Sequence, residues 1–257
     1  MEINPEPDLQ QLAQTWEVLG EQDPLWAVAS LPDKRGGRWN LEEFMETGEQ
    51  AIAHYHQLIA SHVPNVGTFS NVLDFGCGVG RLTCAWSRRA RQATGVDISS
   101  SMLEVAKKNL TERENIHFVL NQNQDLRVFK DGEFDLVFSL ICLQHMPWPM
   151  AAGYIREFAR VCQRGGIVAF QLPSRARRFN WAGKLRKTFI DCLPFGWGRF
   201  YRRWRHGNPV VFDMHYTACP MVEATAASVG LKLLQREPDA SAGAATEGFF
   251  YIFKKLE

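Results

Sequence analysis

The chain has 257 residues, of which 46% are hydrophobic and 22% charged. These proportions are typical of globular proteins and exclude a disordered, collagen-like or coiled-coil chain. The formal net charge of +1 argues against a general nucleic-acid-binding protein, but it conceals a segment, residues 174–206, with ten basic residues and one acidic residue.

The N-terminal part predicts two helices. It has no apolar core of a secretory signal, and no apolar run in the chain is long enough to span a bilayer, so we expect a cytoplasmic protein. Residues 8–20 have apolar side chains at helical spacing and predict an amphipathic helix. Asn40 is the expected N-cap of a helix over residues 41–62, with Glu43 completing a capping box.

From residue 71 onward, short apolar strands alternate with helices. Strands are expected at 71–75, 93–96, 116–120, 134–140 and 166–172, and helices at 81–91, 100–110 and 149–162. This alternation predicts a parallel sheet with helices on both faces. It stops at Pro173 and resumes with a helix near 217–229 and strands at 232–236 and 249–253. We therefore expect an insertion at 173–215, which favours a functional role for that segment.

A glycine-rich loop follows the first expected strand. Residues 74–80 read Asp-Phe-Gly-Cys-Gly-Val-Gly, and glycines let a ligand approach the backbone at the start of the next helix. Asp97 ends the second strand, where an acid typically accepts hydrogen bonds from ribose hydroxyls. A carboxylate at Asp74 would repel a pyrophosphate but could pair with an ammonium. A ribose ligand with a cationic amino-acid tail is S-adenosylmethionine.

These segments resemble the motifs of the class I S-adenosylmethionine-dependent methyltransferases of the bacterial small-molecule type. VLDFGCGVGRL is similar to the first motif of that family, GVDIS to the second and FDLVFSLICLQHMP to the fourth-strand motif. The resemblance implies an α/β, Rossmann-like, doubly wound sheet of seven strands in the order 3-2-1-4-5-7-6, with the last strand antiparallel. It also implies an N-terminal helical extension at 1–65 and a methyltransferase domain at 66–257 that carries the insertion at 173–215 as a basic, aromatic cap.

The resemblance further implies which residues hold S-adenosylmethionine. Asp74 and the glycine loop would hold the methionine part, Asp97 the ribose, and Ile98 and Met102 the adenine. Gln122 stands where many members of the family carry an acid that faces the adenine amino group. The expected cofactor-binding residues are Asp74, Gly76, Cys77, Gly78, Gly80, Arg81, Asp97, Ile98, Met102, Asn123, Gln124, Asp125, Leu126, Leu140 and Gln144.

His145, just beyond the fourth strand, is the candidate catalytic residue. Methyl transfer from a sulfonium chiefly requires alignment of acceptor and donor, and a histidine at this edge of the sheet could accept the acceptor's proton. Alternatively, His145 could contact the acceptor or the cofactor without taking a proton, or it could have a structural role. No metal site is expected. Residues 26–48 could close over the cofactor, with Trp39 or Phe44 above it, or pack as a helix on the sheet edge.

The basic segment, residues 174–206, interleaves eight aromatic residues with its ten basic ones. It could form a lid whose arginines face an anionic or polar acceptor, an interfacial helix that contacts an anionic membrane or a lipid-linked acceptor, an RNA-binding surface or a solvated loop. The expected substrate-binding residues are Trp181, Arg199, Arg202 and Arg203.

The sequence thus predicts an enzyme that transfers a methyl group from S-adenosylmethionine to oxygen or nitrogen of a small-molecule or lipid-linked acceptor with anionic character. If the acceptor is lipid-linked, we also expect peripheral membrane contact through residues 174–206. An RNA methyltransferase and a non-catalytic cofactor-binding protein on the same fold are the alternatives. We do not expect nucleic acid as the partner, because the sequence lacks the Asn/Asp-Pro-Pro-aromatic signature of many amino-directed nucleic-acid methyltransferases.

Overall fold

The computed structural model describes residues 8–63, 68–176 and 214–257. Their strands form one seven-stranded sheet in the order β3-β2-β1-β4-β5-β7-β6, and this confirms the predicted order. The first five strands in the chain are parallel, while β7 runs antiparallel to both β5 and β6. The strands are β1 (Phe69–Phe75), β2 (Ala90–Asp97), β3 (Ile116–Leu120), β4 (Phe134–Ser139), β5 (Cys162–Ala176), β6 (Leu231–Asp239) and β7 (Thr246–Lys255).

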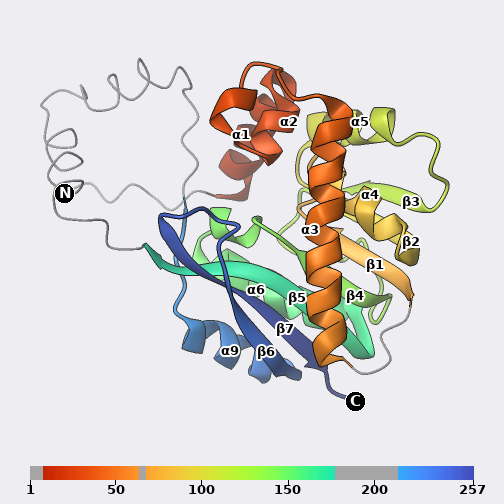
Figure 1. Ribbon diagram of the computed structural model, residues 1–257. Coiled ribbons are helices and arrows are strands. Elements are labelled where there is room, and N and C mark those ends of the chain that lie inside the picture. The colour runs from red at the N-terminus through yellow and green to blue at the C-terminus, as the bar shows by residue number, and fades with distance from the viewer. Residues whose placement is uncertain (1–7, 64–67, 177–213) are drawn as a thin grey trace, which may run out of the picture.

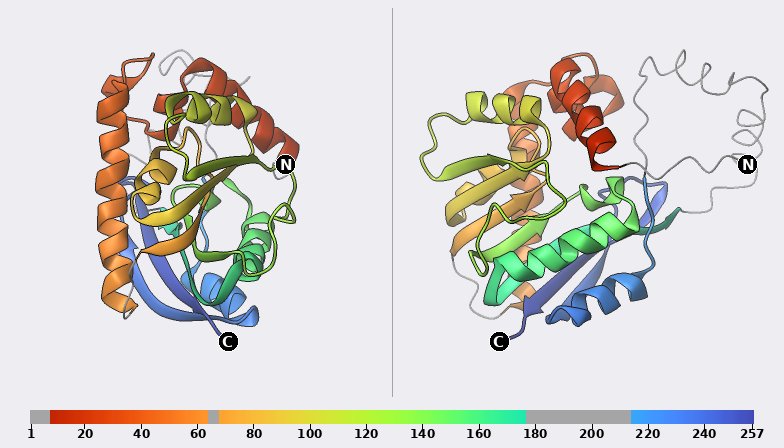
Figure 2. Two further views of the ribbon diagram at one scale, coloured as in Figure 1. Left: turned by 90° about the vertical axis from the view of Figure 1, so that its right-hand side faces the viewer. Right: turned by 180° about the vertical axis from the view of Figure 1, so that it is seen from behind.

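Helices cover both faces of this sheet, as Figures 1 and 2 show. The helices α3 (Leu41–His62) and α4 (Arg81–Ser87) pack on one face, against buried side chains of β1, β4, β5 and β7. The helices α6 (Trp148–Val161) and α9 (Cys219–Ser228) pack on the other, where Phe158 and Phe170 meet. Both faces of the central strands are therefore buried, which explains their continuous apolar runs.

Side-chain caps fix the beginnings of three helices. Asn40 accepts a hydrogen bond of 3.1 Å from the Glu43 N–H at the start of α3, and Ser99 accepts one of 3.2 Å from the Met102 N–H at the start of α5 (Ser100–Asn109). Asp8 does the same for α1 (Leu9–Gln22). These bonds satisfy N–H groups that have no partner within the helix. Glu43 pairs with Lys34 at 2.6 Å.

Several elements begin or end at other residues than predicted, and two of these differences have a clear structural cause. The helix expected over residues 81–91 ends at Ser87, because β2 already begins at Ala90, where it pairs with Phe69. The fifth strand continues through Pro173 to Ala176, because β7 supplies an antiparallel partner as far as Thr246. An irregularity in the register between residues 173 and 175 accommodates the proline. The expected insertion at residue 173 thus starts within a paired strand.

The N-terminal helices α1 and α2 (Pro24–Val28) lie together at the end of the molecule opposite α9 (Figure 1). Their core joins Leu19 and Ala27 to Trp39, Phe44 and Met102. The described residues also form two 3-10 turns, η1 (Pro32–Lys34) and η2 (Leu143–His145). The helices α1 and α2 therefore pack against α5 and the start of α3.

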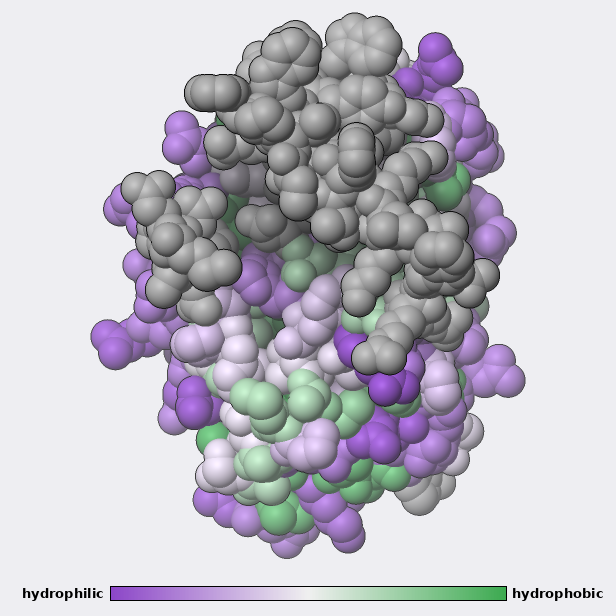
Figure 3. Space-filling model, turned by 90° about the vertical axis from the view of Figure 1, so that its left-hand side faces the viewer, coloured by the Kyte–Doolittle hydropathy of each residue, from purple (hydrophilic) through white to green (hydrophobic). Residues whose placement is uncertain are grey.

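No helix in the described part of the chain is long and apolar enough to cross a membrane. Figure 3 shows hydrophilic and hydrophobic side chains interspersed on the coloured part of one face. Most of residues 174–206, for which membrane contact is expected, lie outside the described residues, as do Trp181, Arg199, Arg202 and Arg203. Arg175, which the structure does describe, forms an ion pair of 2.8 Å with Glu247.

Candidate functional site

A cavity of about 700 Å³ opens where β1, β2 and β4 end. In open α/β sheets the carboxyl ends of the strands are the usual place for a ligand, and this volume is in the range of small-molecule sites. Its walls come from the glycine loop after β1, the ends of β2 and β4, η2, α1, the stretch from α2 to Leu31, and the β6–β7 turn. The site is therefore assembled from segments spread over most of the chain.

The glycine loop passes directly under the cavity. Gly76 has a φ of 76°, and a Cβ there would lie 2.2 Å from Cys142 Sγ, so the loop can adopt this path only with glycine. The N–H of Gly78 donates a hydrogen bond of 2.8 Å to the Asp97 carboxylate. Gly76, Cys77 and Gly78 line the cavity, whereas Gly80 does not, because it lies against Phe118 and Leu110 at the start of α4.

Asp97 faces the cavity from the end of β2. Its second carboxylate oxygen accepts a hydrogen bond of 2.9 Å from the Ser99 N–H. Burial raises the pKa of Asp97, while the N–H groups of Ser99 and Gly78 oppose that shift. Ile98 and Met102 line the same part of the wall. An oriented carboxylate bound only to backbone N–H groups retains acceptor capacity for the hydroxyls of a ligand.

Asp74 is not part of the cavity wall. It is 1% exposed and accepts a hydrogen bond of 2.6 Å from the Thr83 hydroxyl. Burial raises its pKa to about 6. The sequence-based assignment of Asp74 to direct contact with the methionine part therefore does not fit this geometry. The carboxylate instead holds α4 against the end of β1.

Arg81 brings a positive charge to the cavity. Its side chain is 9% exposed, lies 5.7 Å from the Phe44 ring and donates a hydrogen bond of 3.1 Å to the Thr47 hydroxyl. Within the described residues no carboxylate forms an ion pair with it, and its Nε has no partner. Burial lowers its pKa, although Asp74 nearby opposes that effect. A buried guanidinium with unused donors fits an anionic group of a ligand.

The loop after β3 departs most from the prediction. Only Asn121 lines the cavity; Asn123, Gln124, Asp125 and Leu126 do not. The amide of Asn121 donates to the carbonyls of Asn123 and Asp125, at 3.2 and 2.8 Å. The Tyr154 hydroxyl binds the Asn123 carbonyl at 2.8 Å. These bonds turn the loop onto α6 and leave Asn121 as its one contact with the cavity.

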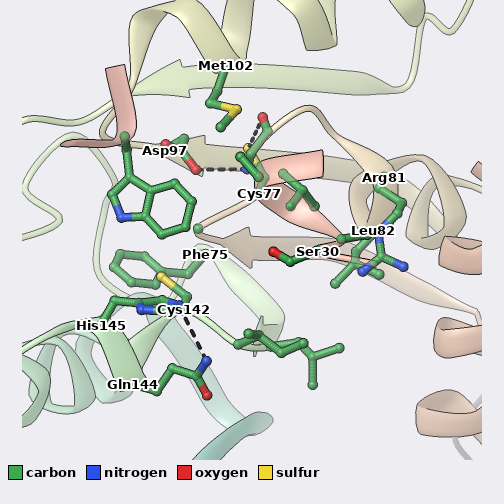
Figure 4. Close-up of a pocket in the computed structure, with 18 of the residues that line it drawn as sticks. Ser30, Phe75, Cys77, Arg81, Leu82, Asp97, Met102, Cys142, Gln144 and His145 are labelled. Carbon is green, nitrogen blue, oxygen red and sulfur yellow. Dashed lines mark hydrogen bonds between the residues drawn. The ribbon is translucent and has the colours of Figure 1, made fainter. Parts of the chain in front are cut away.

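His145 and Gln144 line the cavity opposite Asp97 and Met102, as Figure 4 shows. The His145 ring meets the Trp16 ring edge-on, with 5.3 Å between centroids. The amide nitrogen of Gln144 lies 3.4 Å from His145 Nε2. Ile141, just before η2, also lines the cavity and has a φ of 56°, which is a strained conformation for a β-branched residue. The strained backbone at Ile141 thus lies between the end of β4 and η2, which carries Gln144 and His145.

Titratable groups are few on this wall. Burial raises the pKa of Cys77 and of Cys142, and it also raises that of Tyr154, so all three stay protonated near neutral pH. Among the described lining residues this leaves Asp97 and His145 as the groups able to accept a proton. No group of described His, Cys, Asp and Glu side chains could hold a metal ion.

The sequence-based prediction found one side of the cavity and missed much of the other. Of the expected cofactor-binding residues, those on the wall are Gly76, Cys77, Gly78, Arg81, Asp97, Ile98, Met102, Leu140 and Gln144. Trp39 also reaches the wall, whereas Phe44 is fully buried beside Arg81. Ala27, Val28, Ala29, Ser30, Leu31 and Thr47 also line the cavity and belong to the segment 26–48, for which closure over the cofactor is one of the two expectations. The lining residues not foreseen include Leu12, Trp16, Phe75, Ile141, Met146, Tyr154, Met214, Ser241, Ala242 and Gly243. The helical spacing of Leu12 and Trp16 indicated an apolar face but not what that face covers.

Comparison with known proteins matches residues 73–170 to the family model described as "Methyltransferase domain". The ubiquinone biosynthesis O-methyltransferase of Alkalilimnicola ehrlichii is 31% identical over 136 residues, which cover 51% of this chain and 54% of that protein. The enzyme of the same name from Albidiferax ferrireducens is 34% identical over 128 residues, or 49% and 50% of the two chains. The matched part thus spans about half the length of these relatives.

Solved structures extend the similarity to almost the whole chain. Magnesium protoporphyrin IX methyltransferase from Synechocystis PCC 6803, with bound S-adenosylhomocysteine, has a TM-score of 0.65 at 16% identity and covers 96% of this chain and 100% of its own. The [4+2]-cyclase SpnF has a TM-score of 0.63 at 17% identity, with 98% of both chains covered. At these identities the likeness concerns the fold alone.

Proposed function

We propose that this chain, whose residues 73–170 match the methyltransferase-domain model, is a class I S-adenosylmethionine-dependent methyltransferase. It would transfer a methyl group from S-adenosylmethionine to oxygen or nitrogen of a small-molecule or lipid-linked acceptor. The observation that carries the proposal is one continuous cavity with two unlike sides. One side has the glycine loop, Asp97 and Arg81, and the other has aromatic and apolar walls beside His145.

The residues present fit the cofactor. Asp97 retains acceptor capacity for the ribose hydroxyls, and the side chains of Ile98 and Met102 offer apolar surface to the adenine. The partnerless Nε of the buried Arg81 suits the carboxylate of the methionine part. Asp74 would act through α4 rather than by contact. When bound, S-adenosylmethionine supplies an activated methyl group, and the protein has to orient the acceptor toward it and exclude water.

His145 is the proposed general base for an acceptor that keeps a proton. It lies on the acceptor side of the cavity, and Asp97, the other described group able to accept a proton there, is bound to Gly78 and Ser99. Deprotonation of a hydroxyl near neutral pH suits an imidazole. The O-methyltransferases among the relatives support oxygen as the methylated atom.

The described walls favour an acceptor that is uncharged at its reacting end. Leu12, Trp16, Met146 and Tyr154 are apolar or aromatic, and such walls penalise an unpaired charge. Anionic character, membrane contact through residues 174–206 and the roles of Trp181, Arg199, Arg202 and Arg203 remain predictions from the sequence, as does a cytoplasmic location. A negatively charged or lipid-linked part of the acceptor would then have to extend away from these walls.

Two measurements test the proposal. Calorimetry should detect binding of S-adenosylmethionine and S-adenosylhomocysteine, and Asp97→Ala should weaken both. Incubation with methyl-labelled S-adenosylmethionine and fractionated cell extract should label a small-molecule or lipid fraction. Absence of binding would overturn the proposal, whereas labelled RNA would favour the RNA methyltransferase. Binding without label in any fraction would favour a non-catalytic protein.

A further inference from the structure

We propose that Glu17 in α1 is a positioning residue that connects the cofactor side of the cavity to its acceptor side. This inference rests on the proposed function, because it assigns the two sides to those ligands. According to this proposal, a cofactor held at Asp97 stabilises the position of α1 against α5. The helix α1 in turn completes the wall of the cavity that would face the acceptor. Glu17 itself does not line the cavity.

The carboxylate of Glu17 binds the start of α5. It accepts hydrogen bonds from the hydroxyls of Ser99 and Ser100, at 2.9 and 2.6 Å, and from the N–H of Ser101 at 3.2 and 3.3 Å. Burial alone would raise the pKa of Glu17, but these hydrogen bonds outweigh it and lower the pKa. The side chain therefore binds as a carboxylate, which the positive end of the α5 dipole also favours.

The two helices approach closely enough to require a small residue. A Cβ at Gly20 would lie 2.1 Å from the Ser101 hydroxyl oxygen, which itself donates a hydrogen bond of 2.9 Å to the Glu17 carbonyl. Leu19 of α1 and Met102 of α5 share one apolar cluster. The docking of α1 is thus a specific polar and close-packed contact rather than a loose apolar one.

Ser99 connects this contact to the cofactor side. Its N–H donates to Asp97, its hydroxyl donates to Glu17, and the same hydroxyl accepts from the Met102 N–H. Asp97 and Met102 both line the cavity. A ligand that orders Asp97 therefore also orders the residue to which Glu17 is bonded.

Trp16 connects the contact to the acceptor side. It precedes Glu17 in α1, lines the cavity and meets the His145 ring at 5.3 Å. Leu12, one helical turn earlier, lines the cavity as well. Displacement of α1 from α5 would withdraw both side chains from the acceptor wall and remove one neighbour of His145. Because energetic coupling between sites is reciprocal, an acceptor on this wall would also favour bound cofactor.

The test uses S-adenosylhomocysteine as the probe and hydrogen exchange as the readout. In the full chain, saturation with this ligand should slow amide exchange in residues 9–22 about fivefold or more, the lower range of typical coupling between sites. Glu17→Ala should abolish that ligand-dependent slowing and, because the coupling is reciprocal, weaken the ligand's affinity by about the same factor. Glu21→Gln, in the same helix and exposed, is the matched control and should behave like the wild type.

Glu17→Gln and Ser100→Ala provide milder disruptions in case Glu17→Ala prevents folding. Each should reduce the slowing of exchange in residues 9–22 without changing the exchange of β4 and β5. Equal slowing in the wild type and in all three variants would overturn the role of Glu17. Failure of the wild type to bind S-adenosylhomocysteine at all would instead overturn the proposed function, so the two failures are distinguishable.

Discussion

The hydroxyl of Tyr55 in α3 donates a hydrogen bond of 2.5 Å to the carboxylate of Asp239 at the end of β6. Asp239 also accepts from the N–H and the hydroxyl of Ser241, and Ser241 lines the cavity. Burial, with the charge of Asp239, raises the pKa of Tyr55 well above its usual value, so its hydroxyl remains a donor. This contact fixes the β6–β7 turn to the helix on the other side of the site.

Tyr55→Phe should loosen that turn. A hydrogen bond to a charged group contributes about 1.5–3 kcal/mol, and water can partly replace it at the half-buried Asp239, so we expect a loss of about 1.5 kcal/mol in the free energy of unfolding. The KM for the acceptor should rise more than the Kd for S-adenosylhomocysteine. Urea unfolding and steady-state kinetics measure the two effects. Asp239→Asn, which keeps an acceptor oxygen, should cost less; an equal or larger loss would contradict the assignment.

Asp74 should make stability depend on pH. Its pKa is raised from 3.8 to about 6 by burial, so the folded state favours the protonated form. The resulting stabilisation is fully present below about pH 4 and is lost as the pH rises through 6. A shift of this size corresponds to about 2–3 kcal/mol.

Asp74→Asn removes that titration while keeping an oxygen that can accept from Thr83. Relative to the wild type, the variant should therefore become more stable by about 2–3 kcal/mol between pH 4 and pH 7. Urea unfolding without ligand, at several pH values, measures the difference. Parallel stability curves for the two proteins would show that Asp74 does not titrate in this range.

Gly76 should not tolerate a side chain. An added Cβ would meet both Sγ and Cβ of Cys142, at 2.2 and 2.7 Å, in a backbone conformation with positive φ. Gly76→Ala should cost about 1–3 kcal/mol of stability and weaken S-adenosylhomocysteine binding by displacing the loop. Cys142→Ala alone should leave binding nearly unchanged.

The double variant separates the two causes. Replacing Cys142 by alanine removes Sγ but leaves its Cβ 2.7 Å from the new methyl group, so the double variant should recover only part of the binding. Calorimetry of S-adenosylhomocysteine binding to the wild type, the two single variants and the double variant measures this recovery. Full recovery would mean that Sγ alone excludes the side chain and that the backbone conformation costs little.

Local patterns predicted the parts of the site that are local in the sequence. The glycine loop follows a strand whose apolar run marks its own end, Asp97 is the last residue of the next strand, and the capping pattern of Asn40 needs only three residues of context. Asn123–Leu126 do not line the cavity, because contacts from Asn121, Tyr154 and Glu157 set the direction of that loop. Those partners become neighbours only after α6 packs on the sheet.

The acceptor wall could not be read from the sequence for the same reason. Trp16 reaches His145 only because α1 docks on α5, and Ser241 reaches the cavity only because Tyr55 holds Asp239. The early end of α4 is likewise a tertiary effect, since Ala90 pairs with Phe69 rather than continuing the helix. Sequence spacing carries no information about such pairs.

His145 is expected to act in the chemical step. If it accepts the acceptor's proton, His145→Asn should lower kcat by about 10²- to 10⁴-fold and leave S-adenosylhomocysteine binding unchanged. Added imidazole should restore part of the activity of His145→Ala. His117→Asn is the control, because His117 is an exposed histidine on β3 that pairs with Gln92 of β2. Equal kcat in the wild type and both His145 variants would remove the histidine from the mechanism.

Arg81 offers the sharpest test of how the cofactor is held. If its guanidinium pairs with the carboxylate of the methionine part, Arg81→Met should weaken S-adenosylhomocysteine binding by about 10- to 100-fold, the equivalent of one charge-assisted hydrogen bond. Binding of 5′-methylthioadenosine, which lacks the amino-acid part, should not change. Arg88→Met, an exposed arginine that pairs with Glu49, should affect neither ligand.

Stability distinguishes this role from a structural one. Arg81 is buried without an ion-pair partner among the described residues, and replacing a poorly compensated buried charge with an apolar side chain is often neutral or stabilising. Arg81→Met should therefore bind S-adenosylhomocysteine more weakly while its free energy of unfolding, measured without ligand, stays equal or rises. A parallel fall in affinity for both ligands and in stability would mean that Arg81 supports the fold rather than the carboxylate.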